Sequence, residues 1–546
     1  MAKIENGSNR IWDLDGLPFN IPSKVRKVYE KNYIKNRAKI TNWLDSLSKN
    51  NGDDLDWWML SITLRDPYRS KLLDYLTSIE TIRNIKDSNI KISSKSYALI
   101  NLLKYRYQNK NQFFVENSSF LKITVIKNLF KNFLFQILLF VYVKVFEKRK
   151  IKKENVILVD KFVTSNYVHN DSFLTIKKKN IYTVPTFIPT LNIFRLFKII
   201  KIFKKKEKKY LFKESFINFS DILFAFGHYF RRRNFLNKSY NFQGLEIDSL
   251  IKEEIKNFDD FSSISTGILN FKFFQRLEEN EINVISTFNW FENQLIDKGW
   301  NLGFRKFYQK NQKNCFGYQD FSKHYNYLNH SPSKLEYASK VTPEKIILIS
   351  KNFTRSTKEF FKKQKVIIGE TWRFKKYLNI RLVPLKKRKK ILFILCGVKE
   401  IDKILLSIAV KLCGKIKPMQ VFIKFHPILD PKYLKVEKKY PENLIFSDEK
   451  LFKSLKDTFI AITSGPSSAL LESSSSGAFC VIPNIECGTK KNLDILNLKS
   501  NQYFITENID QTISQIIYIF KKKNKLKNVA NKLIKSSNSV KKILNI

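Results

Sequence analysis

The sequence is poor in glycine, cysteine and acidic residues. Its 546 residues include 15 glycines and 5 cysteines, and 49 acidic residues stand against 99 basic ones. The cysteines are odd in number, widely spaced and form no C-x-x-C pair, so neither a disulfide framework nor a cysteine zinc site is expected. A Walker A motif, a G-x-G-x-x-G fingerprint and an H-E-x-x-H motif are also missing, which argues against an ATPase, a dehydrogenase and metal chemistry.

The net charge of +50 has two interpretations. It is typical of proteins that bind nucleic acid, an anionic membrane or a phosphate-bearing ligand. Abundant Lys, Asn, Ile and Phe beside few Gly also match the residue bias of an A/T-rich genome. Because the lysines are dispersed and no nucleic-acid module is recognisable, a nucleic-acid partner is not expected. A basic nucleic-acid or membrane-binding protein without catalysis stays open as an alternative.

Two segments of the sequence indicate where in the cell the protein is located. The stretch 1–17 is polar and lacks the apolar core of a secretory signal, so a cytoplasmic location is expected. The run FLFQILLFVYVKVF at 133–146 is strongly apolar but shorter than the roughly 20 residues of a membrane span. It is either a buried helix or strand, or a contact with the cytoplasmic face of a membrane.

Composition and periodicity divide the chain into six parts. Hydrophobic residues make up 43% of it, enough for large buried cores. We predict a helical N-terminal region, a basic and apolar connector, an α/β domain, a basic linker, a second α/β domain and a C-terminal helix. Their ranges are 1–110, 111–154, 155–383, 384–390, 391–508 and 509–546.

Short apolar runs alternating with amphipathic stretches indicate parallel sheets with helical crossovers in both domains. The runs in the first are 155–160, 282–287, 345–350 and 366–369; those in the second are 391–395, 420–425, 459–463 and 478–483. The predicted fold class is therefore α/β, with two Rossmann-like, doubly wound domains facing a cleft and a helical N-terminal extension.

The strongest local signal is a serine-rich turn between a strand and a helix, AITSGPSSALLE at 461–472. The hydroxyls of Ser464, Ser467 and Ser468 and the free amides of a helix N-terminus favour an anion, and Gly465 allows close backbone approach. Glu472 lies one turn after Ser468 and could reach a ribose or sugar hydroxyl. Ordinary helix capping by serine is the competing interpretation.

The second signal is the strand end FIKFHP at 422–427. Pro427 stops further pairing, and ligands of parallel sheets bind beyond the carboxyl ends of strands. Lys424 and His426 could therefore meet a phosphate held by the serine turn, although a single strand-end histidine is more often structural.

Lys-x-His-Pro, Ser-Gly-Pro-Ser-Ser, Leu-Leu-Glu and the strand FCVIP in this order resemble the donor half of GT-B glycosyltransferases of bacterial surface-carbohydrate biosynthesis. O-antigen and capsule enzymes, polysialyltransferase-like and capsule Kdo transferases are the similar groups. The resemblance implies that Lys424, His426, Pro427 and the serines grip the phosphate and nucleotide of a CMP-sugar.

The first α/β domain of this chain resembles the N-terminal half of such proteins. The resemblance rests on several short motifs and single residues: WFENQ at 290–294, GYQ at 317–319, Pro332, Glu336, VTP at 341–343, Gly369 and Arg373. This resemblance places Asn293, Gln294, Gln319 and Arg373 on the acceptor side. The acidic-acidic-Gly motif of bacterial sialyltransferases has Phe261 in place of glycine here, which counts against sialic acid as the donor sugar.

An inverting transfer needs a base near the acceptor hydroxyl. Glu292, flanked by Trp290, is the first candidate, and Asp160 at a predicted strand end is the second; Glu214 and His324 are further choices. No metal and no cofactor are expected, since no Asp-x-Asp motif stands in a GT-A setting and helix dipoles can neutralise the leaving phosphate. The expected partners are a nucleotide-sugar and a glycan or lipid-linked acceptor; an anionic membrane is a further partner under the second interpretation of the run 133–146. A transferase acting on a CDP-polyol is the alternative activity.

Overall fold

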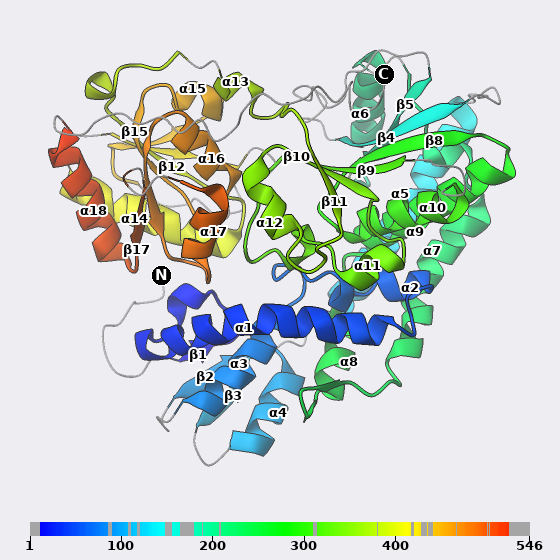
Figure 1. Ribbon diagram of the computed structural model, residues 1–546, viewed down its shortest axis with the longest axis horizontal. Coiled ribbons are helices and arrows are strands. Elements are labelled where there is room, and N and C mark those ends of the chain that lie inside the picture. The colour runs from blue at the N-terminus through cyan, green and yellow to red at the C-terminus, as the bar shows by residue number, and fades with distance from the viewer. Residues whose placement is uncertain are drawn as a thin grey trace.

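The computed structural model describes residues 11–85, 90–107, 111–116, 121–147, 155–163, 180–187, 189–206, 209–308, 314–378, 381–416, 420–426, 434, 440–465, 467–498, 501 and 503–523. An N-terminal region precedes two α/β lobes (Figure 1). The first lobe, in cyan and green, lies at the right of the view, and the second, in yellow to red, lies at the left. The blue helix α1 (Ser23–Ser48) runs beneath both.

The first lobe is built on a parallel sheet in the order β11-β10-β9-β8-β4-β5. Its strands are β4 (Val156–Val163), β5 (Ile181–Phe187), β8 (Val284–Trp290), β9 (Asn314–Gln319), β10 (Lys345–Leu348) and β11 (Lys365–Ile368). The chain order reverses between β4 and β8, and this topological switch point is where open α/β sheets hold ligands.

The second lobe has a parallel sheet in the order β14-β13-β12-β15-β16-β17, which is the Rossmann order. Its strands are β12 (Lys390–Ile394), β13 (Val421–Lys424), β14 (Leu444–Ser447), β15 (Thr458–Ile462), β16 (Phe479–Pro483) and β17 (Tyr503–Thr506). The switch point lies between β12 and β15. The fold class predicted from the sequence, α/β with two Rossmann-like, doubly wound domains, is confirmed.

Helices cover both faces of each sheet because the strands are apolar on both sides. In the first lobe α9 (Phe261–Glu279) and α10 (Leu295–Phe307) cover one face. In the second lobe α14 (Lys399–Lys415) and α18 (Ile509–Lys521) cover one face, and α16 (Ser468–Ser475) and α17 (Thr489–Leu496) cover the other. The shorter helices are α11 (Lys334–Ala338), α12 (Thr354–Thr357), α13 (Lys375–Leu378) and α15 (Leu451–Ser454).

The N-terminal region is mostly helical but also holds a small sheet that the sequence pattern did not predict. Beside α1 it contains α2 (Leu55–Trp58), α3 (Leu72–Asn84) and α4 (Tyr97–Tyr107), and β1 (Trp12–Asp13), β2 (Lys91–Ser94) and β3 (Gln112–Val115) pair in parallel. Its buried side chains share one hydrophobic core with α8 (Asp248–Asn257), α9 and α10. The region is thus packed into the first lobe.

The segment 111–154, expected to be a connector, contains β3 and the 26-residue helix α5 (Leu121–Phe146). Helices α6 (Ile193–Lys206) and α7 (Phe219–Arg231) pack beside α5, and the hairpin of β6 (Asn241–Phe242) and β7 (Leu245–Glu246) follows. The apolar run 133–146 is helical, with one buried and one exposed face.

The chain passes between the lobes before the predicted linker 384–390. Phe374 and Tyr377 already pack with Leu470 of the second lobe. The linker itself is fixed there, because the buried Arg388 donates to the carbonyl oxygens of Thr458 at 3.2 Å and Ser476 at 2.9 Å. Of the predicted C-terminal helix 509–546, α18 covers 509–521, and 524–546 lie outside the described residues.

Candidate active site between the two lobes

The switch point of the second lobe carries a tight loop after β12. Gly397 has a positive φ of 91°, which favours glycine. The carboxylate of Asp402, in the first turn of α14, accepts the amide hydrogens of Cys396 and Gly397, both at 2.8 Å. The loop is therefore held open at the carboxyl edge of the sheet, beside the end of β15.

The serine turn after β15 lies on the other side of this switch point. Ser464 is fully buried beside the Cys396 thiol, and its hydroxyl has no nitrogen or oxygen partner in the described part of the chain. Ser467 caps α16 by accepting from the amide of Ala469 at 3.2 Å. Ser468 instead contacts the first lobe, with its hydroxyl 3.2 Å from that of Ser322. Of the three predicted serines, Ser464 is the one whose hydroxyl makes no hydrogen bond to a nitrogen or oxygen of the described residues.

Gly465 leaves little room for a side chain, since an added Cβ would lie 3.3 Å from Thr489 Cγ2. The hydroxyl of Thr463 is likewise buried without a partner among the described residues. Unpartnered buried hydroxyls cost folding free energy, so their presence side by side in one turn favours a ligand that they would bind.

His426 follows the end of β13, on the same edge of the sheet. The half-buried side chain has no described partner at Nδ1. Burial lowers its pKa, the charge of Arg373 lowers it further, and Asp402 acts in the opposite direction. Because β12 alone separates β13 from β15, His426 and the serine turn are about two strand spacings, roughly 10 Å, apart at one edge.

The structure does not bring Lys424 to the serine turn. Its Nζ donates to the carbonyl oxygen of Ser447 on the neighbouring strand β14 at 3.3 Å. The lysine therefore points toward the outer strand rather than the switch point. Pro427 lies outside the described residues.

Glu472 on α16 is buried and faces the segment that crosses between the lobes. Burial raises its pKa, while the charges of Arg373 and Lys376 and a hydrogen bond from Tyr377 lower it. In this structure the carboxylate thus anchors α13 and faces Arg373. The interpretation as a ribose or sugar ligand stays a prediction.

Arg373 is the residue that links the two lobes electrostatically. Its exposed side chain lies close enough to lower the pKa values of His426, Glu472 and Glu292. Asp320, directly after β9, fixes the backbone of Arg373: its Oδ2 accepts from the Arg373 amide at 2.9 Å and from the preceding amide at 3.0 Å. The acceptor-side position of Arg373 stays a prediction, and the structure places its charge near titratable groups of both lobes.

Glu292 follows β8, at the switch-point side of the first lobe. Its Oε1 accepts from the indole Nε1 of Trp290 at 2.7 Å. Burial raises the pKa of Glu292, and the nearby carboxylate of Asp66 raises it further, against the effect of Arg373. The geometry fits a carboxylate whose basicity is increased by its surroundings.

Asp66 comes from the N-terminal region and was not predicted. The buried carboxyl accepts from Gln294 Nε2 at 2.8 Å, and burial raises its pKa to about 6. Gln294, predicted on the acceptor side, thus joins the N-terminal region to the Glu292 loop. Its other role is to cap α10 together with Asp297.

Asn293, the residue after Glu292, holds the Glu292 loop against Glu336. It has a positive φ of 58°, and its Nδ2 lies 3.1 Å from both carboxylate oxygens of Glu336. Glu336 also pairs with Lys298 at 3.2 Å and with Arg65, and these charges hold its pKa below the usual value despite burial. Asn293 is therefore a buried supporting residue rather than one that can contact an acceptor.

Gln319, at the end of β9, is fully buried and donates to the carbonyl oxygen of His330 at 3.2 Å. His324 lies at the lobe boundary, where its Nδ1 accepts from the amide of Asn326 at 2.9 Å and its Nε2 is 4.0 Å from Glu486 of the second lobe. Neither side chain is exposed to a ligand in this structure, so both have supporting positions.

Asp160 was predicted at a strand end, and this was wrong. β4 continues to Val163, because residues 161–163 pair with 185–187 of β5. Asp160 is buried, accepts from Thr186 at 2.8 Å and lies near Lys213. The adjacent Glu214 is buried in the same cluster, under α5.

Sequence signals could have found part of what was missed. Asp402 follows an apolar run and a glycine and lies in the first turn of a helix, where an acidic residue is favoured. Asp320 follows β9 directly, as strand-end acids do. Asp66 had no such signal, because it lies more than 200 residues from Glu292 along the chain. Among the described residues, no three His, Cys, Asp or Glu side chains gather as a metal-ligand set.

No protein-family model matches the sequence, and no curated protein matches it. Solved structures do match. MurG from Acinetobacter baumannii has 10% identity and a TM-score of 0.35, covering 68% of this chain and 92% of that one. The calicheamicin glycosyltransferase CalG4 has 10% identity and a TM-score of 0.38, with 67% and 89% covered. UDP-GlcNAc 2-epimerase from Neisseria meningitidis, bound to UDP-GlcNAc, has 13% identity and a TM-score of 0.36, with 69% and 95% covered.

Proposed function

We propose that the protein is a metal-independent, inverting glycosyltransferase that moves a sugar from a nucleotide-sugar, with a CMP-sugar favoured, to a surface glycan or a lipid-linked glycan. One observation carries the proposal. Unpartnered polar groups of Ser464 and His426 lie at the switch-point edge of one lobe, Glu292 lies at the edge of the other, and the charge of Arg373 acts on both.

The second lobe would hold the donor. Phosphate oxygens accept hydrogen bonds, and the Ser464 hydroxyl, the free amides at the start of α16 and the guanidinium of Arg373 all donate them. The lowered pKa of His426 keeps its imidazole neutral at pH 7, so it would contribute a hydrogen bond rather than a charge. The positive charge that stabilises the leaving nucleotide then comes from Arg373 and the helix dipole.

The first lobe would supply the base. Glu292 would take the proton of an acceptor hydroxyl while that oxygen attacks the anomeric carbon. The bond from the anomeric carbon to the phosphate oxygen breaks, and the nucleotide leaves with the bonding electrons. A single attack opposite the leaving group inverts the configuration. The raised pKa of Glu292 suits this step, since a base is most efficient when its pKa approaches the working pH.

Binding and turnover test the two halves of the site separately. Calorimetric titration of the full chain with CMP, UDP and CDP measures donor-side affinity, and nucleotide release from CMP-, UDP- and CDP-linked donors measures turnover. We expect CMP to bind most tightly. His426→Asn and Ser464→Ala should each weaken that binding about tenfold, the value of one lost hydrogen bond.

Glu292→Gln should keep nucleotide affinity within about twofold and reduce turnover by roughly 100-fold or more. Glu246→Gln is the matched control, because Glu246 is an exposed carboxylate of the same lobe, on β7. It should change neither value. Failure of all three nucleotides to bind, or full turnover in Glu292→Gln, would contradict the proposal. Turnover with a CDP-polyol alone would assign the alternative activity.

A further inference from the structure

The outer face of the first lobe concentrates exposed apolar side chains. Of the 21 large hydrophobic side chains that are exposed in the described part of the chain, 14 lie on α5, at the start of α6 and on α7. They are Ile123, Ile126, Phe130, Leu134, Val141, Val145, Phe146, Leu191, Ile193, Phe194, Phe219, Leu223, Phe224 and Phe230. We call this set the apolar face. Scattered exposed hydrophobics are ordinary, but a gathering of this size marks an interaction surface.

The spacing of these residues follows the helix period. On α5 the exposed positions 123, 126, 130, 134, 141 and 145 form one stripe, while Val125, Leu129 and Val143 are buried against the lobe. On α7 the exposed Phe219, Leu223 and Phe230 form a second stripe. The two helices lie side by side, since the ring centroids of Phe133 and Phe226 are 4.4 Å apart. The two stripes therefore lie on neighbouring helices.

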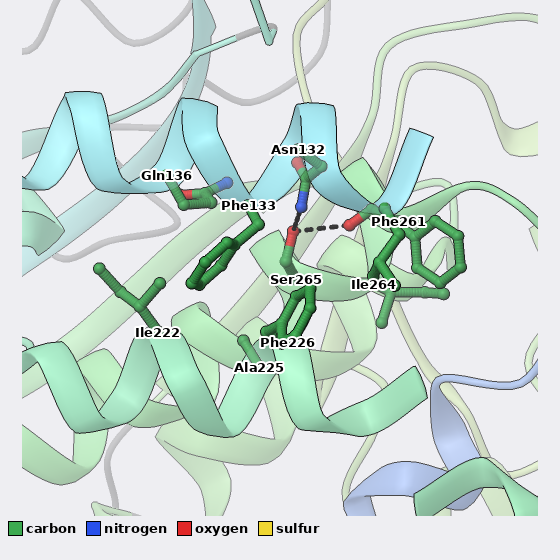
Figure 2. A pocket seen from close by; sticks show the side chains of 10 residues that line it. Asn132, Phe133, Gln136, Ile222, Ala225, Phe226, Phe261, Ile264 and Ser265 are labelled. Atoms are coloured by element: carbon green, nitrogen blue, oxygen red, sulfur yellow. Dashed lines mark hydrogen bonds between the residues drawn. The ribbon is translucent and has the colours of Figure 1, made fainter. Parts of the chain in front are cut away.

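Polar contacts fix α5 in the plane of this surface. By length and composition the stretch Ile123–Phe146 is long and apolar enough to cross a membrane. In the fold, however, Asn132 donates to Ser265 at 2.6 Å, and Lys144 donates to the carbonyl of Ser215 at 3.0 Å. Figure 2 shows the first contact in a small crevice between α5, α7 and α9. A spanning α5 would lose these contacts.

The charge around the apolar face is predominantly positive, with the half-exposed Asp259, which accepts from Asn128 of α5 at 2.8 Å, as an acidic neighbour. The sequences of α5 and α6 contain no acidic residue, and the single acid of α7, Asp221, is buried and paired with Arg276 at 2.8 Å. Exposed basic residues of α5 and α6 border the face: Lys127, Lys131, Arg195, Lys198, Lys201, Lys204 and Lys205. Lys204 pairs with the buried Glu147 at 2.6 Å.

We infer that the apolar face binds the surface of an anionic lipid bilayer, with α5 and α7 lying in its interface. Amphipathic helices with an apolar side and a lysine- and arginine-rich border bind in this way, and the two signals together give stable attachment. Long basic side chains keep their charges at headgroup level while their stems cover apolar surface. A second copy of the chain is disfavoured as occupant, because two-fold pairing would bring the same basic border against itself.

This inference does not depend on the proposed activity. It does give the first lobe an orientation, because α5, α6 and α7 belong to the lobe that carries Glu292 (Figure 1). If the proposed function holds, a lipid-linked acceptor would reach that lobe from the same bilayer. Loss of membrane binding and loss of nucleotide binding are separate measurements, so either idea can fail alone.

Vesicle flotation with the full chain tests the inference. We expect binding to vesicles of phosphatidylcholine with phosphatidylglycerol, weak binding to phosphatidylcholine alone, and weakening by added salt. The double variant Leu134→Glu with Val141→Glu should bind at least tenfold more weakly. Its matched control is Tyr97→Glu with Tyr105→Glu, two exposed aromatic residues on α4, which should bind as the parent does.

The basic border has its own pair of variants. Lys198→Gln with Lys201→Gln should weaken binding and flatten its salt dependence, and Lys362→Gln with Lys363→Gln, also exposed, should not. Circular dichroism melting should show that all variants fold as the parent does. Unchanged binding in the α5 or α6 variants overturns the inference. Resistance of the bound protein to extraction by alkaline carbonate would also overturn it, because it would indicate a membrane-spanning helix. A dimer in light scattering that the α5 variant converts to a monomer would assign the apolar face to a second copy of the chain instead.

Discussion

Replacing Glu486 by glutamine should remove a pH dependence from the stability of the protein. Glu486 follows β16 in the second lobe and is 4% exposed, and neither of its carboxylate oxygens has a hydrogen-bond partner in the described residues. Across the lobe boundary, the Nε2 atom of His324 lies 4.0 Å from the Oε2 atom of Glu486. Burial lowers the pKa of His324 well below its usual value, so this imidazole stays neutral and offers no compensating charge.

The size of the effect follows from the carboxyl pKa. Burial raises the pKa of Glu486 from 4.5 to about 8. A carboxyl group whose pKa is higher in the folded state than in the unfolded state stabilises the folded state when it is protonated. This contribution is fully present below the unfolded-state pKa and is lost as the pH rises through the folded-state pKa. The full difference is about 5 kcal/mol, of which about 1.4 kcal/mol is lost between pH 7 and pH 9.

Urea unfolding at several pH values measures this contribution as the difference between the parent and Glu486→Gln. The variant should be more stable at pH 9 than the parent, and the gap should narrow toward pH 5. Glu442→Gln, at an exposed position of the same lobe, should follow the parent at every pH. A constant gap between parent and Glu486→Gln across this range would refute the reasoning.

Four other substitutions have defined outcomes. Ser464→Ala should stabilise the ligand-free chain by up to about 1 kcal/mol in urea unfolding, because it removes an unpartnered buried hydroxyl, while it weakens nucleotide binding. Gly299→Ala should lower the free energy of unfolding by about 3 kcal/mol or more, since the new Cβ would lie 1.8 Å from the carbonyl oxygen of Gly267 on α9. Its control is Gly414→Ala, which has open space around the new Cβ and should leave the free energy of unfolding unchanged or raise it by up to about 1 kcal/mol in the same assay. Asp320→Ala should lower nucleotide affinity about tenfold in calorimetry, because it removes the carboxylate oxygen that accepts both backbone hydrogens that position Arg373. Unchanged affinity in that variant would separate Arg373 from the donor site.

Much of the fold was predictable because buried parallel strands are continuous apolar runs. The runs at β12, β15 and β16 were placed to within a residue or two. The strands β14 and β17 were missed because edge strands are short and half-exposed, so their pattern is weaker. The run 282–287 was predicted to end too early, since β8 continues to Trp290.

The sequence predicted the positions of those candidate site residues that lie directly after the ends of strands. His426 and Ser464 lie together at one edge because the ends of parallel strands meet there, which the chain order implies. The direction of each side chain was not predictable: Lys424 reaches the neighbouring strand, and Ser468 contacts the other lobe. Those choices depend on tertiary neighbours that no local pattern contains. Whether these residues bind a donor stays a prediction.

The helix beneath the two lobes has a mechanical consequence. Arg37 on α1 donates to the carbonyl oxygen of Tyr325 and pairs with Glu359 of the first lobe at 2.7 Å, whereas Arg26, three turns earlier on the same helix, donates to the carbonyl oxygen of Asn484 in the second. One rigid rod thus fixes the spacing of both halves. A change in the spacing of the two lobes would therefore have to break the contacts at one end of that helix.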